Sequence, residues 1–120
     1  MIDHVTFAVS DLARSKAFYE RALAPLGYRI AFGKEGVFWA FDIGDGLFEI
    51  QRSEEKPPLT RVHVAFRVRS KDDVDAFHRA ALAAGAVDNG APGPRPQYSA
   101  TYYAGFVLDP DGYNIEAMIQ

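Results

Sequence analysis

The sequence of 120 residues contains no cysteine. This absence excludes disulfide bonds, thiolate nucleophiles and cysteine-based zinc sites. Positive charge is also scarce, because 13 Lys and Arg stand against 16 Asp and Glu, for a net charge of −3. A chain without a basic excess or a lysine–arginine cluster is not expected to bind nucleic acid or a membrane surface.

Long hydrophobic runs are missing as well. No apolar run approaches the roughly 20 residues that a membrane-spanning helix needs. The first residues show neither the basic nor the apolar region of a secretory signal, so we expect a cytoplasmic protein. What is present is typical of a globular protein, with 48% hydrophobic and 24% charged residues. The length fits a single compact domain, residues 1–120.

The two halves of the chain resemble each other. An offset of 59 residues places the residues His4, Val5, Phe7 and Val9 on His63, Val64, Phe66 and Val68. An offset of 67 residues places Trp39, Asp42 and Glu49 on Phe106, Asp109 and Glu116. The change of offset indicates a net insertion of eight residues in the second half, which the Gly/Pro-rich segment 89–96 would accommodate. We expect module 1 at about 2–52, module 2 at about 60–119, and a polar, proline-bearing linker at 53–58.

Each half is predicted to fold as a βαβββ unit, which gives an α+β protein. The opening segments 2–9 and 62–68 alternate in polarity, as strands do. Helices are predicted at 11–24, ending before Pro25, and at 71–84, where Ser70 is an N-cap. Further strands are expected at 28–33, 36–43, 46–52, 85–89, 101–109 and 113–119, with a hairpin turn at 109–112.

Strand alternation predicts that four potential metal ligands share one kind of sheet face. The Val and Phe residues of the opening strands suit the face that packs on a helix, so His4 and His63 point to the other face. The last strands place Glu49 and Glu116 on the same mixed-polarity face. Taken singly, a strand histidine is usually structural and a strand glutamate usually solvated. Two imidazoles and two carboxylates together favour a borderline divalent ion: Ni, Zn, Fe(II), Co or Mn.

Other residues are candidates for binding a small-molecule substrate. Arg67 suits an anionic substrate group, but it is equally explained as a charge extending to solvent. Residues on the ligand faces are predicted to line a pocket: Thr6, Gln51, Asn114 and Met118. An aromatic group typical of either a pocket or a core comprises Trp39, Tyr98, Tyr102, Tyr103 and Phe106. The segment 90–96 is interpreted as a lid or as a surface connector, and His78 as a helix-surface residue without function.

Three motifs resemble the vicinal oxygen chelate superfamily, and its glyoxalase-like branch most closely. They are Asp3-His4-Val5, Val62-His63-Val64-Ala65-Phe66 and Asp109-Pro110-Asp111-Gly112-Tyr113-Asn114-Ile115-Glu116. The resemblance implies paired βαβββ modules that form a curved-sheet cleft, and one divalent metal per site. It implies the metal ligands His4, Glu49, His63 and Glu116, and a homodimer, in which some members assemble each site from modules of two chains. The implied chemistry is bidentate chelation of adjacent substrate oxygens and stabilisation of an enediolate, with Glu49 or Glu116 as catalytic base.

Departures from the family pattern narrow the expected reaction. Ala8 stands where glutathione-using glyoxalase I has an arginine, and Ser53 where it has an asparagine. Phe106 stands where extradiol dioxygenases have a tyrosine. We therefore expect a metal-dependent lyase or isomerase acting on a small oxygenated substrate other than a glutathione adduct, with a dioxygenase less favoured. The alternative is a non-catalytic, antibiotic-type binding protein of the same fold.

Overall fold

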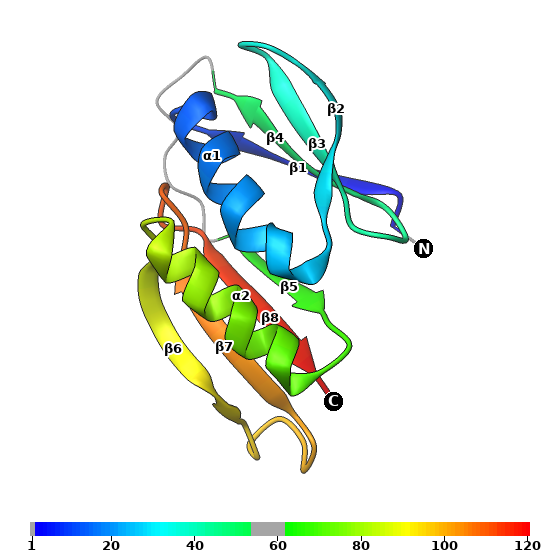
Figure 1. Ribbon diagram of the computed structural model, residues 1–120, viewed down its shortest axis with the longest axis vertical. Helices are drawn as coiled ribbons and strands as arrows, with labels where there is room; N and C mark the ends of the chain where they lie inside the picture. The colour runs from blue at the N-terminus through cyan, green and yellow to red at the C-terminus, as the bar shows by residue number, and fades with distance from the viewer. Residues whose placement is uncertain (1, 54–61) are drawn as a thin grey trace.

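The computed structural model describes residues 2–53 and 62–120, and in this part of the chain each half forms a four-stranded sheet and one α-helix (Figure 1). Most of the predicted linker 53–58 lies outside the described residues. The elements of module 1 are β1 (His4–Val9), α1 (Leu12–Leu23), the 3-10 helix η1 (Ala24–Leu26), β2 (Arg29–Lys34), β3 (Phe38–Asp42) and β4 (Leu47–Arg52). Those of module 2 are β5 (His63–Arg67), α2 (Lys71–Ala83), β6 (Val87–Pro94), β7 (Tyr103–Leu108) and β8 (Asn114–Ile119). The predicted pair of βαβββ units is confirmed.

The two sheets have the same strand order, β1-β4-β3-β2 and β5-β8-β7-β6. In each sheet the first strand runs parallel to the last, and the remaining pairs are antiparallel. This topology places the opening strand of each module directly beside its closing strand. Thr6 is the register partner of Glu49, and Ala65 that of Glu116. Each predicted histidine therefore lies two residues along the strand from the partner of its own module's glutamate.

Local sequence signals set the helix ends. The Asp11 side chain accepts a hydrogen bond from the Arg14 N–H, and the Ser70 hydroxyl accepts one from the Asp73 N–H, so both helices have side-chain N-caps. Helix α1 ends at Leu23, as the following Pro25 predicts, and continues as one 3-10 turn. Neither helix has the length and apolarity of a membrane-spanning segment among the described residues.

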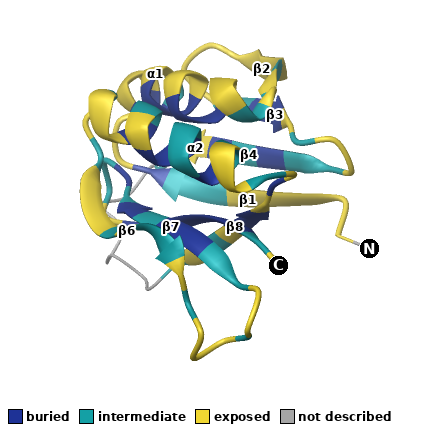
Figure 2. Cartoon of the chain, turned by 60° about the horizontal axis from the view of Figure 1, so that its bottom comes forward, coloured by how far each residue is buried: buried dark blue, intermediate teal, exposed yellow. Residues whose placement is uncertain are grey.

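The two helices lie side by side and cover one face of both sheets (Figure 1). In Figure 2 their outer surfaces are exposed, whereas stretches of β4, β7 and β8 are buried. The core joins the modules, because the Phe48 and Phe66 rings meet edge to face with centroids 5.4 Å apart. The largest fully buried side chains come from both halves: Tyr19, Phe41, Phe48, Phe77, Leu23, Ile50 and Ile115.

The β7–β8 turn binds module 2 to module 1. The Tyr19 hydroxyl donates to the buried Asp109 carboxylate at 2.5 Å, and the Tyr113 hydroxyl donates to the Ala8 carbonyl at 2.7 Å. The Ser10 N–H donates to the Asp111 carboxylate. The motif that most strongly resembles the family thus fixes the relative position of the modules.

Two predictions about module 2 are wrong. The strand expected at 85–89 extends to Pro94, so most of the segment interpreted as a lid or connector is an edge strand paired with β7. Its ladder is irregular near Gly90 and Gly93, which fits an edge position that tolerates proline. His78 is only 7% exposed rather than on the surface, because β6 covers this side of α2. Its Nε2 lies 3.0 Å from an Asp88 carboxylate oxygen.

Candidate metal site

His63 and Glu116 form a close pair on the sheet face that is free of helices. The strand register places them diagonally across β5 and β8, and His63 Nε2 lies 3.0 Å from Glu116 Oε2. The Glu116 side chain is 4% exposed, while that of His63 is 48% exposed. A buried carboxylate is stable only with partners, and the second oxygen, Oε1, accepts a 2.6 Å hydrogen bond from the Tyr102 hydroxyl.

The hydrogen bonds around His63 leave its Nε2 facing a second acceptor. Its Nδ1 lies 3.1 Å from the Asn114 carbonyl oxygen, and a carbonyl can only accept, so Nδ1 holds a proton. A neutral ring then offers a lone pair at Nε2 toward the Glu116 carboxylate, which is also an acceptor. A proton or a cation must therefore lie between the two atoms. A histidine whose Nδ1–H bonds a carbonyl while Nε2 ligates is the usual arrangement at metal sites.

The spacing of the pair fits a metal ion as well. Two ligands at about 2.1 Å from a divalent ion lie about 3.0 Å apart in octahedral geometry and about 3.4 Å apart in tetrahedral geometry. The ligand atoms are one imidazole nitrogen and one carboxylate oxygen, a donor set that suits Zn, Ni, Co or Fe(II). One imidazole and one carboxylate of the predicted ligand set are therefore brought together, and both are donors that such a metal accepts.

His4 and Glu49 form the corresponding pair in module 1, and this pair is more open. The His4 Nδ1 lies 2.8 Å from an Asp3 carboxylate oxygen, which leaves Nε2 available. The hydrogen bond to Asp3 raises the pKa of His4, and the charge of the nearby Glu49 raises it further. Glu49 Oε2 accepts a 2.9 Å hydrogen bond from the Thr6 hydroxyl.

Aromatic side chains surround the second pair. The Phe106 ring stacks on the His63 ring with centroids 6.2 Å apart, and the Arg95 guanidinium lies 5.4 Å from the centre of the Phe106 ring. The Tyr98 ring meets that of Tyr102 edge to face. Burial, and then the bond to Glu116, raise the pKa of Tyr102 to about 12, so its hydroxyl donates throughout the neutral range.

The structure places the predicted substrate-binding residues in different surroundings. Arg67 is exposed and is the register partner of the buried Met118, on the Glu116 face. The Asn114 side chain accepts a hydrogen bond from Asn89. Gln51 is exposed on the Glu49 face, opposite Phe38.

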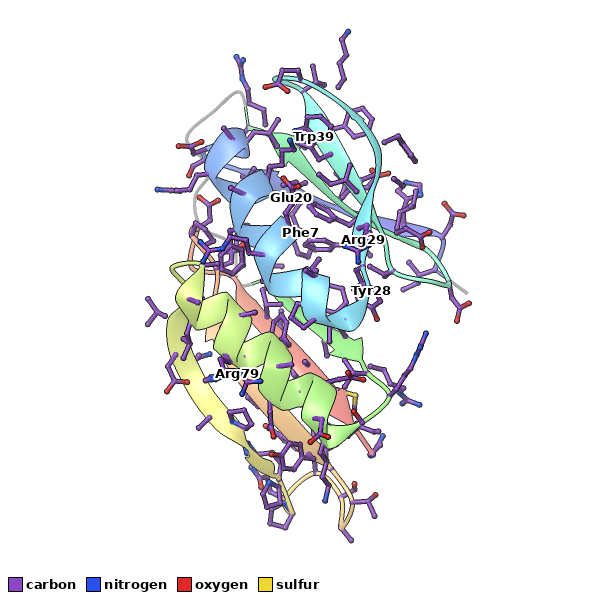
Figure 3. All side chains as sticks on the ribbon, in the orientation of Figure 1. Phe7, Glu20, Tyr28, Arg29, Trp39 and Arg79 are labelled. Atoms are coloured by element: carbon purple, nitrogen blue, oxygen red, sulfur yellow. The ribbon has the colours of Figure 1, made fainter. Side chains whose placement is uncertain are left out.

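Two aromatic residues of the predicted pocket lie on the helix side instead. The Tyr103 hydroxyl donates to Asp75 on α2, whereas the neighbouring Tyr102 contacts Glu116. Trp39 lies beside α1 (Figure 3), and the Nζ of Lys16 on that helix is 4.4 Å from the centre of its ring. The sequence offset of 67 residues therefore aligns β3 with β7 one residue away from their structural equivalence. Trp39 is opposite Ile50, but Phe106 is opposite Glu116.

The two pairs do not meet within the described chain. Among residues 2–53 and 62–120, no group of three His, Asp or Glu side chains is placed to hold a metal. A separate cavity of about 820 Å³ lies where the modules meet. Its lining includes Tyr28, Arg29, Asp45, Arg67 and Arg69. Arg67 thus borders both this cavity and the face of the second pair.

Comparison with known proteins agrees with this fold and these motifs. The model of the Glyoxalase/Bleomycin resistance protein/Dioxygenase superfamily matches residues 1–117, so the chain belongs to that superfamily. No curated protein matches the chain. The crystal structure of a glyoxalase/bleomycin resistance protein from Albidiferax ferrireducens T118 is similar, with 29% identity, a TM-score of 0.87, and coverage of 99% of this chain and 98% of that one.

More distant structures share the fold. A glyoxalase/bleomycin resistance protein/dioxygenase family enzyme from Burkholderia phytofirmans PsJN is 20% identical with a TM-score of 0.79, covering 98% of this chain and 96% of that one. The crystal structure of a lactoylglutathione lyase from Agrobacterium tumefaciens is 18% identical with a TM-score of 0.73, and the match covers 99% of this chain and 92% of that one. The superfamily thus includes enzymes as well as resistance proteins.

Proposed function

We propose that this protein is a metal-dependent enzyme of the glyoxalase family, a lyase or isomerase that acts on a small oxygenated substrate. The observation that supports this most is the chemistry around His63. Its Nδ1 is committed to the Asn114 carbonyl, and its Nε2 faces the Glu116 carboxylate at 3.0 Å. The Nδ1 of His4 is likewise engaged, by the Asp3 carboxylate at 2.8 Å.

A divalent ion, held by His4, Glu49, His63 and Glu116, would supply Lewis-acid stabilisation of negative charge on two adjacent substrate oxygens. The chain's own residues would orient the metal ligands and move protons. Asp3 and the Asn114 carbonyl fix the two rings with Nε2 outward. On leaving the metal, Glu49 or Glu116 would act as the general base that takes a proton from the carbon next to a carbonyl.

We further propose that a homodimer assembles the complete site. His4 and Glu49 of one copy would face His63 and Glu116 of the second, because the two pairs of the described chain remain apart. His4, Thr6, Gln51, His63 and Ala65 are all exposed on these faces. A cytoplasmic location belongs to the same proposal, since nothing in a cysteine-free chain requires an oxidising compartment.

The substrate is proposed not to be a glutathione adduct. Ala8 follows Thr6 on the site face of β1, and its methyl group offers no charge to a substrate carboxylate. In module 2 the position equivalent to Ala8, four residues after His63, is held by Arg67. We assign it to an anionic group of a different substrate.

Elemental analysis of the purified protein tests the metal site. Wild-type protein reloaded with Zn²⁺ or Ni²⁺ and desalted is expected to retain the metal near stoichiometrically. His4→Ala and Glu116→Ala should each lose it, because each removes a ligand. The matched control is His78→Ala, which removes a histidine that contacts Asp88 instead. Metal-free wild-type protein after reloading contradicts the proposal.

A second candidate is a non-catalytic protein that binds a small molecule. The cavity at the module junction favours it, because about 820 Å³ is within the range of small-ligand sites. Its lining mixes aromatic and charged side chains, such as Tyr28 and Arg69. Metal retention that depends on His4 and Glu116, with turnover of a hydroxy-carbonyl compound, supports the first candidate. Ligand binding that is unchanged by metal removal supports the second.

A further inference from the structure

Each glutamate of the candidate site accepts a hydrogen bond from a hydroxyl group, and the two hydroxyls come from different parts of the βαβββ unit. Thr6 on β1 donates to Glu49 Oε2 at 2.9 Å. Tyr102, which immediately precedes β7, donates to Glu116 Oε1 at 2.6 Å. The duplicated modules therefore make the same contact with different residue types.

The repeat shows that the two donors replace one another. Thr6 is the register partner of Glu49, and the residue in the same position opposite Glu116 is Ala65, which has no hydroxyl. Conversely, Tyr102 ends the long connection 95–102 between β6 and β7. The connection between β2 and β3 covers only 35–37, Glu-Gly-Val, and offers no hydroxyl to Glu49. Because non-equivalent residues make this contact in the two modules, we attribute the contact to a requirement of the carboxylate rather than to the packing of one strand.

We propose that Tyr102 is a positioning residue that fixes Glu116 for the metal ion, as Thr6 fixes Glu49. The role rests on the proposed metal site. The Tyr102 hydroxyl occupies Oε1 and so leaves Oε2, the atom 3.0 Å from His63 Nε2, as the ligand atom. The edge-to-face contact with the Tyr98 ring, with centroids 5.1 Å apart, holds the phenol in place. Partners of this kind orient metal ligands and strengthen binding.

The two hydroxyl contacts differ in how deeply the accepting glutamate is buried. The Glu116 side chain is 4% exposed, so water has little access to replace a lost hydroxyl. Glu49 is half-buried, and water can solvate its carboxylate when Thr6 is removed. We therefore expect the loss of the Tyr102 hydroxyl to weaken metal binding more than the loss of the Thr6 hydroxyl.

Titration calorimetry of the full chain with Zn²⁺ tests this role. Tyr102→Phe keeps the ring and removes the hydroxyl, and it should bind Zn²⁺ about 10- to 100-fold more weakly than wild type. Tyr103→Phe is the matched control, because the Tyr103 hydroxyl donates to Asp75 on the helix side of the sheet rather than to a glutamate. It should bind as wild type does. Circular dichroism and urea unfolding of each variant establish that it is folded.

A rescue variant separates positioning from packing. Adding Ala65→Thr to Tyr102→Phe introduces a hydroxyl opposite Glu116, in the position that Thr6 holds opposite Glu49. Ala65 is exposed, so the larger side chain has room. The double variant should recover most of the lost affinity. A purely structural role for Tyr102 would leave the double variant as weak as the single one.

The outcomes distinguish this role from the proposed function. Wild-type protein that binds no Zn²⁺ overturns the metal site and, with it, the role of Tyr102. Wild-type protein that binds Zn²⁺ and loses it in Glu116→Ala, but not in Tyr102→Phe, overturns only the role of Tyr102. Weak binding by Tyr102→Phe without rescue by Ala65→Thr also overturns it, and assigns the effect to packing.

Discussion

The hydroxyl of Tyr19 donates a 2.5 Å hydrogen bond to the carboxylate of Asp109, across 90 residues of sequence and between the two modules. Tyr19 is fully buried and Asp109 is 4% exposed. The other Asp109 oxygen accepts the N–H groups of Asp111 and Tyr113. One side chain therefore shapes the β7–β8 turn and joins that turn to α1. Because β8 carries Glu116, this contact also sets where the second ligand pair lies relative to module 1.

Removing the Tyr19 hydroxyl should destabilise the protein. Tyr19→Phe keeps the buried ring but leaves a buried oxygen of Asp109 without a donor, which costs about 1–3 kcal/mol of unfolding free energy. Urea unfolding followed by circular dichroism measures the change. Tyr98→Phe is the control, because the Tyr98 side chain is largely exposed, and its midpoint should match that of wild type. Equal stability of both variants would show that the bond contributes nothing.

Asp109 should also make stability depend on pH in the acid range. Burial raises the pKa of Asp109, against the lowering effect of its hydrogen bonds, so the folded state favours the protonated carboxyl more than the unfolded state does. Its contribution is full below the unfolded pKa and is lost as pH rises through the folded pKa. Asp109→Asn stays neutral and escapes this loss. The stability of Asp109→Asn minus that of wild type should rise with pH from about 4 and then level off.

Urea midpoints measured in parallel at a series of pH values test this expectation. Other carboxyl groups titrate in both proteins and cancel in the difference. Asp111→Asn serves as a comparison for the same turn, because the Asp111 carboxylate accepts from the Ser10 N–H at the edge of the turn rather than in the core. A difference between wild type and Asp109→Asn that is constant with pH would contradict the assignment.

The sequence predicted that His4, Glu49, His63 and Glu116 take the sheet faces that are free of helices, because strand alternation and duplication act locally. Alternation fixes which face a residue takes, and the parallel pairing of first and last strands then brings His63 beside Glu116. The contacts of Tyr102 and Tyr103 were not predictable in the same way. The face that each residue takes depends on where β7 begins after the irregular connection 95–102, and composition does not reveal that phase.

Similar reasons explain the misplacement of other residues. Trp39 and Phe106 align at the sequence offset, but the β3–β4 turn spans residues 43–46 and the β7–β8 turn spans 109–113. One additional residue moves the aromatic side chain to the opposite face. His78 was assigned to the helix surface because the offset of 59 residues matches it with Tyr19 rather than with a ligand, but Tyr19 is itself fully buried. His78 is buried because α2 packs against β7 and β6, where its Nε2 meets Asp88.

Gly46 is expected to control the position of His4. A Cβ at Gly46 would lie 2.6 Å from the Asp3 carbonyl oxygen, which already accepts the Leu47 N–H at 2.8 Å. Gly46→Ala must therefore displace the backbone that leads into His4, and should weaken Zn²⁺ binding as well as stability. Gly36→Ala, in the β2–β3 turn, is a control for general loss of stability, because a left-handed φ of 75° disfavours alanine there without displacing Asp3. If calorimetry shows equal Zn²⁺ affinities for the two variants, the displacement of His4 has no effect on the site.

Assembly of the site across a homodimer makes a quantitative prediction for mixed variants. His4→Ala and Glu116→Ala each disrupt both sites of their own homodimer. In a hybrid dimer, however, one site receives both substitutions and the other receives none. Random exchange makes half of the dimers hybrids, so about a quarter of the wild-type metal content should return on mixing. Elemental analysis after unfolding and refolding the mixture gives the measurement.

Mixing His4→Ala with Glu49→Ala provides the matched control. Both substitutions lie in module 1, so every site of a hybrid still combines a damaged module 1 with an intact module 2. Metal should not return in this mixture if each site takes one module from each chain. A site built from the two modules of a single chain gives no recovery in either mixture. Recovery in the first mixture alone is therefore the result that only the shared site explains.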